Sequence, residues 1–202
     1  MKFTSLTALA ALTSLGFAAA QDGVPSGAYD LDPAHTSVIW SVSHAGFSMY
    51  RGSFGEVSGD LDWNAEDPTQ SSLTVTIGAD SVIVPDAPSH AGNTTFSEDI
   101  AKNALGSEEN PTITFTSTSL EKTSDTEGVV KGDLSFNGQT HPAEMKVKLV
   151  QAADFMGTPK IGFSGEVTID RTKWGSDSWV QYNIGKDVTI SVNTEFAKEA
   201  AE

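Results

Sequence analysis

The sequence predicts a mainly β protein in which about eight antiparallel strands close into an up-and-down barrel with one short helix. Three observations support this fold class. Apolar and polar residues alternate along most of the chain from Tyr29 onward, as expected for strands with one buried face. Turn-forming residues separate the alternating runs, and residues 94–105 alone change to helical spacing.

The alternating runs supply the strands. The clearest places Val38, Trp40, Val42 and His44 on one face, with serines on the other. The remaining runs are marked by their apolar members, which are Leu73, Val75 and Ile77; Ile113 and Phe115; Leu134 and Phe136; Met145, Val147 and Leu149; Ile161, Phe163, Val167 and Ile169; and Val188, Ile190, Val192 and Phe196. Asn137-Gly138 and residues 125–128 are hairpin signals.

The helix is expected over residues 94–105, which read TTFSEDIAKNAL. Phe96, Ile100 and Ala104 recur at helical spacing, a threonine stands at the start, and Gly106 follows the end. Phe96 and Ile100 would then share one helical face, which we expect to cover one end of the barrel.

A closed barrel removes the exposed edges that a long antiparallel sheet would present. Strands of about eight residues would enclose an interior about 20 Å long. Its inward faces are almost wholly apolar, so the interior is either packed with side chains or filled by an apolar ligand. The periodicity leaves both alternatives open.

Residues 1–20 have the pattern of a secretory signal peptide. Lys2 supplies the positive charge, residues 6–17 form a short apolar run, and small residues lead to processing near Ala20. The run is shorter than the about 20 apolar residues of a membrane-spanning helix. We therefore expect a periplasmic or secreted protein without a stable membrane anchor, with one domain over residues 21–202.

The composition excludes several classes of function. The chain has 27 acidic and 12 basic residues and a net charge of −15, which becomes −16 when Lys2 leaves with the leader. Such acidity disfavours nucleic acid as a partner. The chain has no cysteine, which excludes disulfides, a thiol nucleophile and cysteine metal sites. The four histidines have no metal-ligand spacing and no catalytic motif occurs, so we expect no metal, no cofactor and no enzymatic activity.

Six stretches occur in order along the mature chain: residues 29–37 (YDLDPAHTS), 40–47 (WSVSHAGF), 52–55 (GSFG), 110–118 (NPTITFTST), 132–140 (GDLSFNGQT) and 171–175 (RTKWG). Together they resemble the YceI-like family of exported lipid-binding proteins. The resemblance implies a lipocalin-like antiparallel barrel that holds a polyisoprenoid or another amphiphile. Before the helix the family usually reads Arg-Asp-x-His-Leu, whereas residues 89–93 here read SHAGN, which argues against a family role for a charged group there.

The pattern and the resemblance give a set of candidate ligand contacts. The cavity-lining candidates are Trp40, Val42, His44, Phe54, Phe96, Ile100, Phe115, Phe136, Phe163, Trp174 and Trp179. His44 is either a buried core histidine or a contact to a ligand head group. Trp174, Trp179 and Tyr182 are either hydrophobic cover over a barrel end or an aromatic rim at the entrance.

Arg51, Arg171 and Lys173 are the candidates to meet an anionic head group. A pyrophosphate normally needs several cations, so a neutral head such as a quinone or an amide fits so few bases equally well. In that alternative Arg171 pairs with a local carboxylate.

Three functions follow as hypotheses. The first is a binding protein that holds a polyisoprenoid, a quinone or a similar long-chain amphiphile for transport, storage or sequestration. The second is an enzyme acting on such a lipid, for which His44 is the only candidate. The third is an interaction protein with a filled core. The sequence is also compatible with a homodimer.

Overall fold

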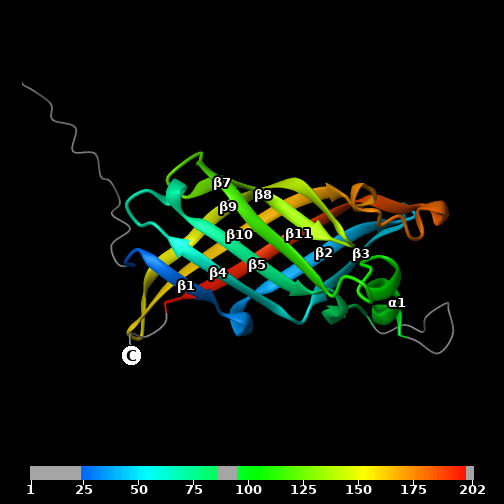
Figure 1. Ribbon diagram of the computed structural model, residues 1–202, viewed down its shortest axis with the longest axis horizontal. Helices are drawn as coiled ribbons and strands as arrows, with labels where there is room; N and C mark the ends of the chain where they lie inside the picture. Colours follow the sequence, from blue (N-terminus) through cyan, green and yellow to red (C-terminus); the bar gives the residue numbers. More distant parts are fainter. Residues whose placement is uncertain (1–23, 86–94, 199–202) are drawn as a thin grey trace, which may run out of the picture.

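The computed structural model describes residues 24–85 and 95–198 as a β-barrel with one α-helix at one end (Figure 1). The predicted signal peptide and residues 89–93 lie outside the described residues. The strands are β1 (Gly27–Leu31), β2 (Ser37–His44), β3 (Ser48–Phe54), β4 (Val57–Trp63), β5 (Ser72–Gly78), β6 (Val82–Ile83), β7 (Thr112–Lys122), β8 (Glu127–Phe136), β9 (Gln139–Phe155), β10 (Thr158–Asp170) and β11 (Ile184–Ala197).

The sheet closes on itself as an antiparallel ring. Its order is β1-β4-β5-β7-β8-β9-β10-β11, and β1 pairs back onto β11 through Asp30 with Ala197 and Leu31 with Phe196. β2 continues along β11 after the 3-10 turn η1 (Pro33–His35), and β3 and β6 extend the wall beyond it. The ring has eight strands, so the predicted eight-stranded antiparallel barrel is confirmed.

The turns define two ends of the barrel. The helix end carries α1 (Phe96–Asn103), the β2–β3 turn, the β8–β9 turn and residues 171–183 (Figure 1). The loop end carries residues 64–71, the β7–β8 turn and the β9–β10 turn. Asn137 and Gly138 both have positive φ, 48° and 71°, which explains why this dipeptide joins β8 to β9.

The helix forms where the sequence predicts it, because its ends are well capped. Thr95 and Glu98 make a reciprocal capping box, in which Thr95 Oγ1 accepts from the Glu98 amide and Glu98 Oε2 accepts from the Thr95 amide. Gly106 has a φ of 64° and follows the C-terminal turn. Ile100, Ala101 and Ala104 are buried against Val82 and the aromatic residues of the helix end, so α1 covers that end of the barrel.

Candidate functional site

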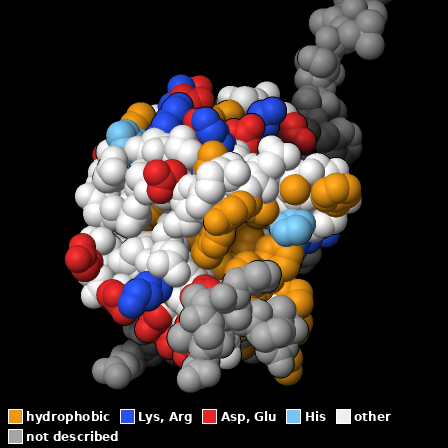
Figure 2. All heavy atoms as spheres, turned by 90° about the vertical axis from the view of Figure 1, so that its right-hand side faces the viewer, with side chains coloured by type: hydrophobic (Ala, Val, Ile, Leu, Met, Phe, Trp, Pro, Cys, Tyr) orange, Lys and Arg blue, Asp and Glu red, His pale blue; other side chains and the backbone are white. Residues whose placement is uncertain are grey.

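A large cavity of about 1500 Å³ occupies the barrel interior and reaches residues of both ends. Ligand pockets usually measure about 300–1,000 Å³. Apolar side chains make up most of the wall, and Figure 2 shows them around a hollow at the helix end. The alternative of a core filled by side chains is therefore wrong.

The cavity is long. Tyr50 on β3 and Trp63 on β4 both line it, and these two strands follow one path along the wall. Thirteen residues at about 3.3 Å each, tilted by about 40°, separate them by about 30 Å along the barrel axis. This exceeds the length expected from the sequence because β7 to β11 have 10 to 17 residues each.

Two glycines explain why large rings do not fill the space. Gly52 lies opposite Trp40, and a Cβ at Gly52 would overlap the indole. A Cβ at Gly132 would likewise overlap the ring of Phe115 from the neighbouring strand. Each ring therefore lies against the wall over a glycine, and the centre of the barrel stays open.

Four aromatic residues from four segments form a chain at the helix end, which we call the aromatic cluster: Trp40, Tyr50, Phe96 and Trp179. Their successive ring centroids are 6.0, 5.7 and 6.0 Å apart. All four line the cavity. Such tilted and edge-on contacts stabilise one another while presenting an apolar surface to the interior.

The structure brings most predicted residues to the cavity wall. Those that line it are Trp40, Val42, His44, Phe54, Phe96, Ile100, Phe115, Phe136, Phe163 and Trp179. His44 is exposed where β2 ends, so the expectation of a buried core histidine is wrong. Contact of these residues with a ligand stays a prediction.

Trp174 does not line the cavity, contrary to the sequence-based expectation. It is only 2% exposed, stacks on Phe136 at 5.3 Å between ring centroids, and donates from Nε1 to the Leu134 carbonyl at 2.9 Å. The ring of His141 meets it edge-on at 5.1 Å. Trp174 thus seals the barrel wall beside the cavity.

Arg171 lines the cavity, but its guanidinium is occupied. Nε donates to the Gly185 carbonyl at 3.0 Å, one terminal nitrogen donates to the carbonyl and hydroxyl of Ser176, and the other donates to the Ser178 carbonyl at 2.8 Å. Burial lowers the pKa of Arg171, while Asp177 and Asp170 oppose that effect. Arg171 therefore braces the β10–β11 connection, mainly through backbone carbonyls rather than through the carboxylate pair considered from the sequence.

The other two cationic candidates are elsewhere. Arg51 and Lys173 are both exposed and neither lines the cavity. Arg51 neighbours the inward-facing Tyr50, so strand alternation turns it outward. None of the three predicted cations thus offers a free charge to the cavity.

Sequence reasoning missed Tyr50 and Trp63, which both line the cavity. Their side chains also hold the two buried polar atoms without a hydrogen-bond partner among the described residues, Tyr50 Oη and Trp63 Nε1. Tyr50 and Phe54 are four residues apart, and Trp63 is two residues from Leu61, so period-two alternation contained the signal.

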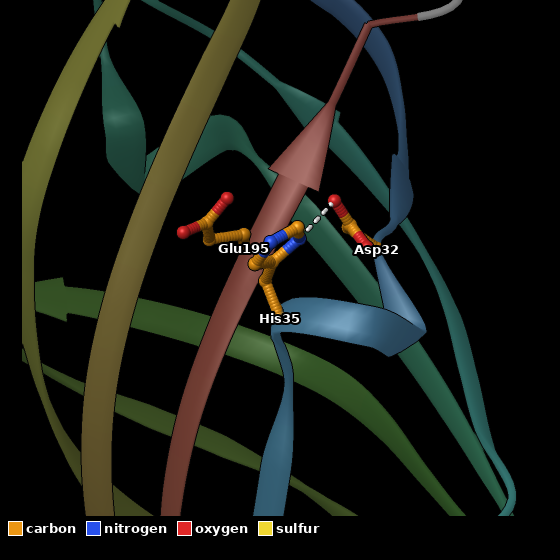
Figure 3. A group of neighbouring side chains, drawn as sticks. All are labelled: Asp32, His35 and Glu195. Atoms are coloured by element: carbon orange, nitrogen blue, oxygen red, sulfur yellow. Dashed lines mark hydrogen bonds and ion pairs between the residues drawn. The ribbon is translucent and has the colours of Figure 1, made fainter.

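A separate polar group lies on the outside of the barrel near its seam (Figure 3). Asp32 and Glu195 lie beside His35, with metal-ligand atoms within 4.8 Å of one another. However, Lys160 Nζ is 3.3 Å from Asp32 and 3.0 Å from Glu195, and His35 Nδ1 is 2.8 Å from Asp32. The lysine ammonium already bridges both carboxylates and takes the place between them that a cation would occupy, so this group is an ion-pair network rather than a cation site.

Hydrogen bonds from His35 and then from Lys160 lower the pKa of Asp32. Hydrogen bonds from Lys160 to Glu195 and to Asp32 raise the pKa of Lys160 in turn. The network joins the turn η1 and its N-cap Asp32, which directly follows β1, to β10 and β11, and it therefore stabilises the closure of the barrel.

Within the described part of the chain, no helix has the length and apolarity that a membrane crossing requires.

Known proteins are similar to this chain in both sequence and architecture. A UPF0312 protein of Pectobacterium atrosepticum is 31% identical over 168 residues, 82% of this chain and 81% of that protein. A UPF0312 protein of Shewanella baltica is 32% identical over 149 residues, 72% of this chain and 74% of that protein.

Solved structures show the same fold. Burkholderia cenocepacia BcnA superposes with a TM-score of 0.70 at 18% identity, covering 82% of this chain and 98% of BcnA. A polyisoprenoid binding domain from Saccharophagus degradans gives 0.65 at 13% identity, covering 85% of this chain and 98% of that domain. The YceI-like domain model matches residues 29–196, and the chain therefore belongs to the YceI-like family.

Proposed function

We propose that this protein is an exported, non-enzymatic binding protein that holds a polyisoprenoid or a comparable long-chain amphiphile in its barrel for transport, storage or sequestration. The single observation that carries the proposal is the apolar cavity of about 1500 Å³. A polyisoprenoid ligand is suggested by the solved domain from Saccharophagus degradans, which is described as polyisoprenoid-binding.

The energetics favour reversible binding. Moving a CH₂ group from water to an apolar site gains about 0.8 kcal/mol. A lipid tail in a bilayer is already out of water, so its transfer into the barrel gains little. The cavity therefore suits a carrier or scavenger that exchanges its ligand with membranes. The signal-peptide pattern of residues 1–20 supports the assignment to the periplasm or the extracellular space.

Cavity-blocking variants test the proposal. Leu149 lines the cavity on β9, whereas its neighbour Val150 is 63% exposed on the outer face. We expect Leu149→Trp to weaken binding of a fluorescent polyprenol analogue about tenfold or more by filling the space, and Val150→Trp to leave it unchanged. Equal binding by both variants and the wild type would refute binding inside the barrel.

Native mass spectrometry of protein purified from its own host would identify the ligand. We expect a bound mass that organic extraction removes and that the Leu149→Trp variant lacks. Turnover of that lipid, abolished by His44→Ala, would instead support the enzymatic alternative.

A further inference from the structure

We propose that the helix end of the barrel docks on the surface of a phospholipid bilayer through three exposed apolar side chains, Phe47, Met49 and Tyr182, which we call the apolar lip. This inference rests on the proposed function, because the bilayer is the compartment with which the barrel would exchange its ligand. It adds the surface that makes the contact.

The apolar lip is exposed on two neighbouring turns at the helix end (Figure 1). Phe47 is 90% exposed, Met49 is 53% exposed and Tyr182 is 68% exposed. Large apolar side chains that gather on a surface mark contact sites for proteins or membranes. Phe47 and Met49 do not line the cavity, so holding a ligand inside the barrel does not account for their exposure.

Backbone hydrogen bonds fix the two turns against each other. The Phe47 amide donates to the His44 carbonyl at 3.0 Å and closes the β2–β3 turn. The Ala45 amide in the same turn donates at 3.1 Å to the carbonyl of Asn183, which directly follows Tyr182. The chain thereby presents the apolar lip on a preformed backbone, so its insertion into a bilayer costs little conformational entropy.

The apolar lip borders the mouth of the cavity. Tyr182 itself lines the cavity, and so does its neighbour Gln181. On the other turn, His44 and Ser48 line it as well, and all four residues are exposed. Figure 2, which faces this end, shows hydrophobic side chains around the hollow. A bilayer that receives the lip therefore meets the opening, and a lipid tail passes between the two without crossing water.

The charges nearby favour a bilayer as the occupant. Residues 43–50 and 178–185 contain both turns and have no acidic residue, lysine or arginine, although the chain has 27 acidic residues. Arg51 and Lys186 follow directly, are exposed, and form no ion pair within the described part of the chain. Arg51 is four residues behind Phe47, on the order of 10 Å along the barrel axis. Because apolar groups enter a bilayer by about 5–10 Å, Arg51 reaches the depth of the lipid phosphates.

The loop end is less suited to this contact. It also exposes a phenylalanine and a methionine, Phe155 and Met156, but neither lines the cavity. The carboxylates of the cavity wall at this end are those of Glu66, Glu121, Asp125 and Glu127. Lipid phosphates repel such groups. At the helix end, Asp99 alone among the described acidic residues lines the cavity, and it is buried.

Two double variants form the test, because the chain exposes the same pair of residue types at each end. Phe47→Ser/Met49→Ser removes two members of the lip and leaves the cavity wall unchanged, and Phe155→Ser/Met156→Ser makes the matched change at the loop end. Each protein is purified from its own host, loaded with a fluorescent polyprenol analogue and mixed with phosphatidylcholine vesicles. Flotation measures docking, and stopped-flow fluorescence measures transfer of the analogue to the vesicles.

We expect the wild type to float with the vesicles and to transfer the analogue at a rate that rises in proportion to the vesicle concentration. Phe47→Ser/Met49→Ser should lower the vesicle partition coefficient and this rate about tenfold, because it removes two apolar side chains from the contact. Its equilibrium affinity for the analogue in vesicle-free solution should change less than twofold. The loop-end variant should match the wild type in all three measurements.

Four results would overturn the inference: a transfer rate independent of vesicle concentration, flotation that is abolished by about 0.5 M salt, which screens charge but not apolar contact, equal losses in both double variants, or no loss in Phe47→Ser/Met49→Ser. A wild-type dimer in sedimentation velocity that does not float, and that Phe47→Ser/Met49→Ser dissociates, would assign the lip to a second copy of the chain instead. Each of these leaves the proposed function intact if the protein binds the analogue in solution. Failure to bind it would refute the proposed function as well.

Discussion

The indole of Trp40 on β2 lies over Gly52 on β3, at the position where a side chain would otherwise stand. The large ring thereby becomes part of the wall rather than an obstruction. The carbonyl of Ile83 lies close to Gly52 as well, so the site is confined by both a side chain and the backbone.

Replacement of Gly52 by alanine should therefore destabilise the barrel and narrow the cavity. The new Cβ would displace the indole or separate β3 from β6, at a cost of about 1–3 kcal/mol in the free energy of unfolding. Gly162→Ala is the matched control, because its Cβ would meet nothing closer than 3.8 Å. Denaturant unfolding measures both, and equal stability of the two variants would contradict this account of the wall.

The helix face formed by Phe96 and Ile100 should retain the ligand. Both residues line the cavity, and Phe96 joins Tyr50 to Trp179 in the aromatic cluster. Replacing both with serine removes apolar contact with a bound tail and should raise the dissociation rate of an isoprenoid probe about tenfold. Stopped-flow transfer to acceptor vesicles measures this rate.

Ile100 is buried, so its replacement also removes packing between the helix and the barrel. The single variant Phe96→Ser is therefore measured beside the double variant, because it keeps that packing. Lys102→Ser changes an exposed residue of the same helix that lies off the cavity wall, and it should leave the rate unchanged. Dissociation rates that match the wild type in both the double variant and Phe96→Ser would rule out α1 as a gate.

Arg171→Gln should lower the free energy of unfolding without changing the preference of the protein for one head group over another. The substitution leaves carbonyls of Ser176, Ser178 and Gly185 without their donor, which should cost about 2–4 kcal/mol in the free energy of unfolding. The affinity ratio of anionic to neutral probes should not change. A selective loss of the anionic probe would show instead that Arg171 reads the head group. Arg51→Gln, at an exposed position, should affect neither quantity.

The Lys160 network should contribute to stability in a pH-dependent way. The pKa of Asp32 is lowered from its ordinary value of 3.8, chiefly by His35 and then by Lys160. The stabilisation is therefore fully present above that value and is lost as the pH falls through the lower pKa of the folded state. Lys160→Met should destabilise the protein most near neutral pH, and the difference from the wild type should shrink below about pH 4.

Denaturant unfolding at several pH values measures this difference. Lys102→Met serves as the control, because its ion pair with Glu108 is more than half exposed and should contribute little at any pH. A destabilisation by Lys160→Met that is constant from pH 7 to pH 3 would show that lost packing, not charge, is responsible.

The fold could be predicted because a barrel wall imposes a period of two on every strand. That period placed Trp40, Phe115 and Phe163 on the inner face, where the structure has them. It did not show that the wall contains 11 separate strands in the described part of the chain. The inward-facing positions change from odd to even numbers across η1, from Leu31 to Val38, and back to odd numbers after Phe54, at Val57.

The site was less predictable where the chain leaves the strands. Trp174 lies in the 3-10 turn η4 (Arg171–Trp174), where alternation no longer tells inside from outside. The role of Arg171 depends on carbonyls as far as Gly185, and no side-chain pattern reveals where those carbonyls point. Tyr50 followed the alternation, but the absence of a partner for its hydroxyl is a property of the folded neighbourhood.

The pairing of β1 with β11 determines when the barrel closes during folding. Asp30 pairs with Ala197, so the first strand of the ring pairs with the last only when almost the whole described chain is present. Contacts so distant in sequence form late, because the entropy of closing the loop must be overcome first. Until the C-terminal strand arrives, the interior is an open sheet with no enclosed space. The barrel therefore encloses its interior only after β11 has paired with β1.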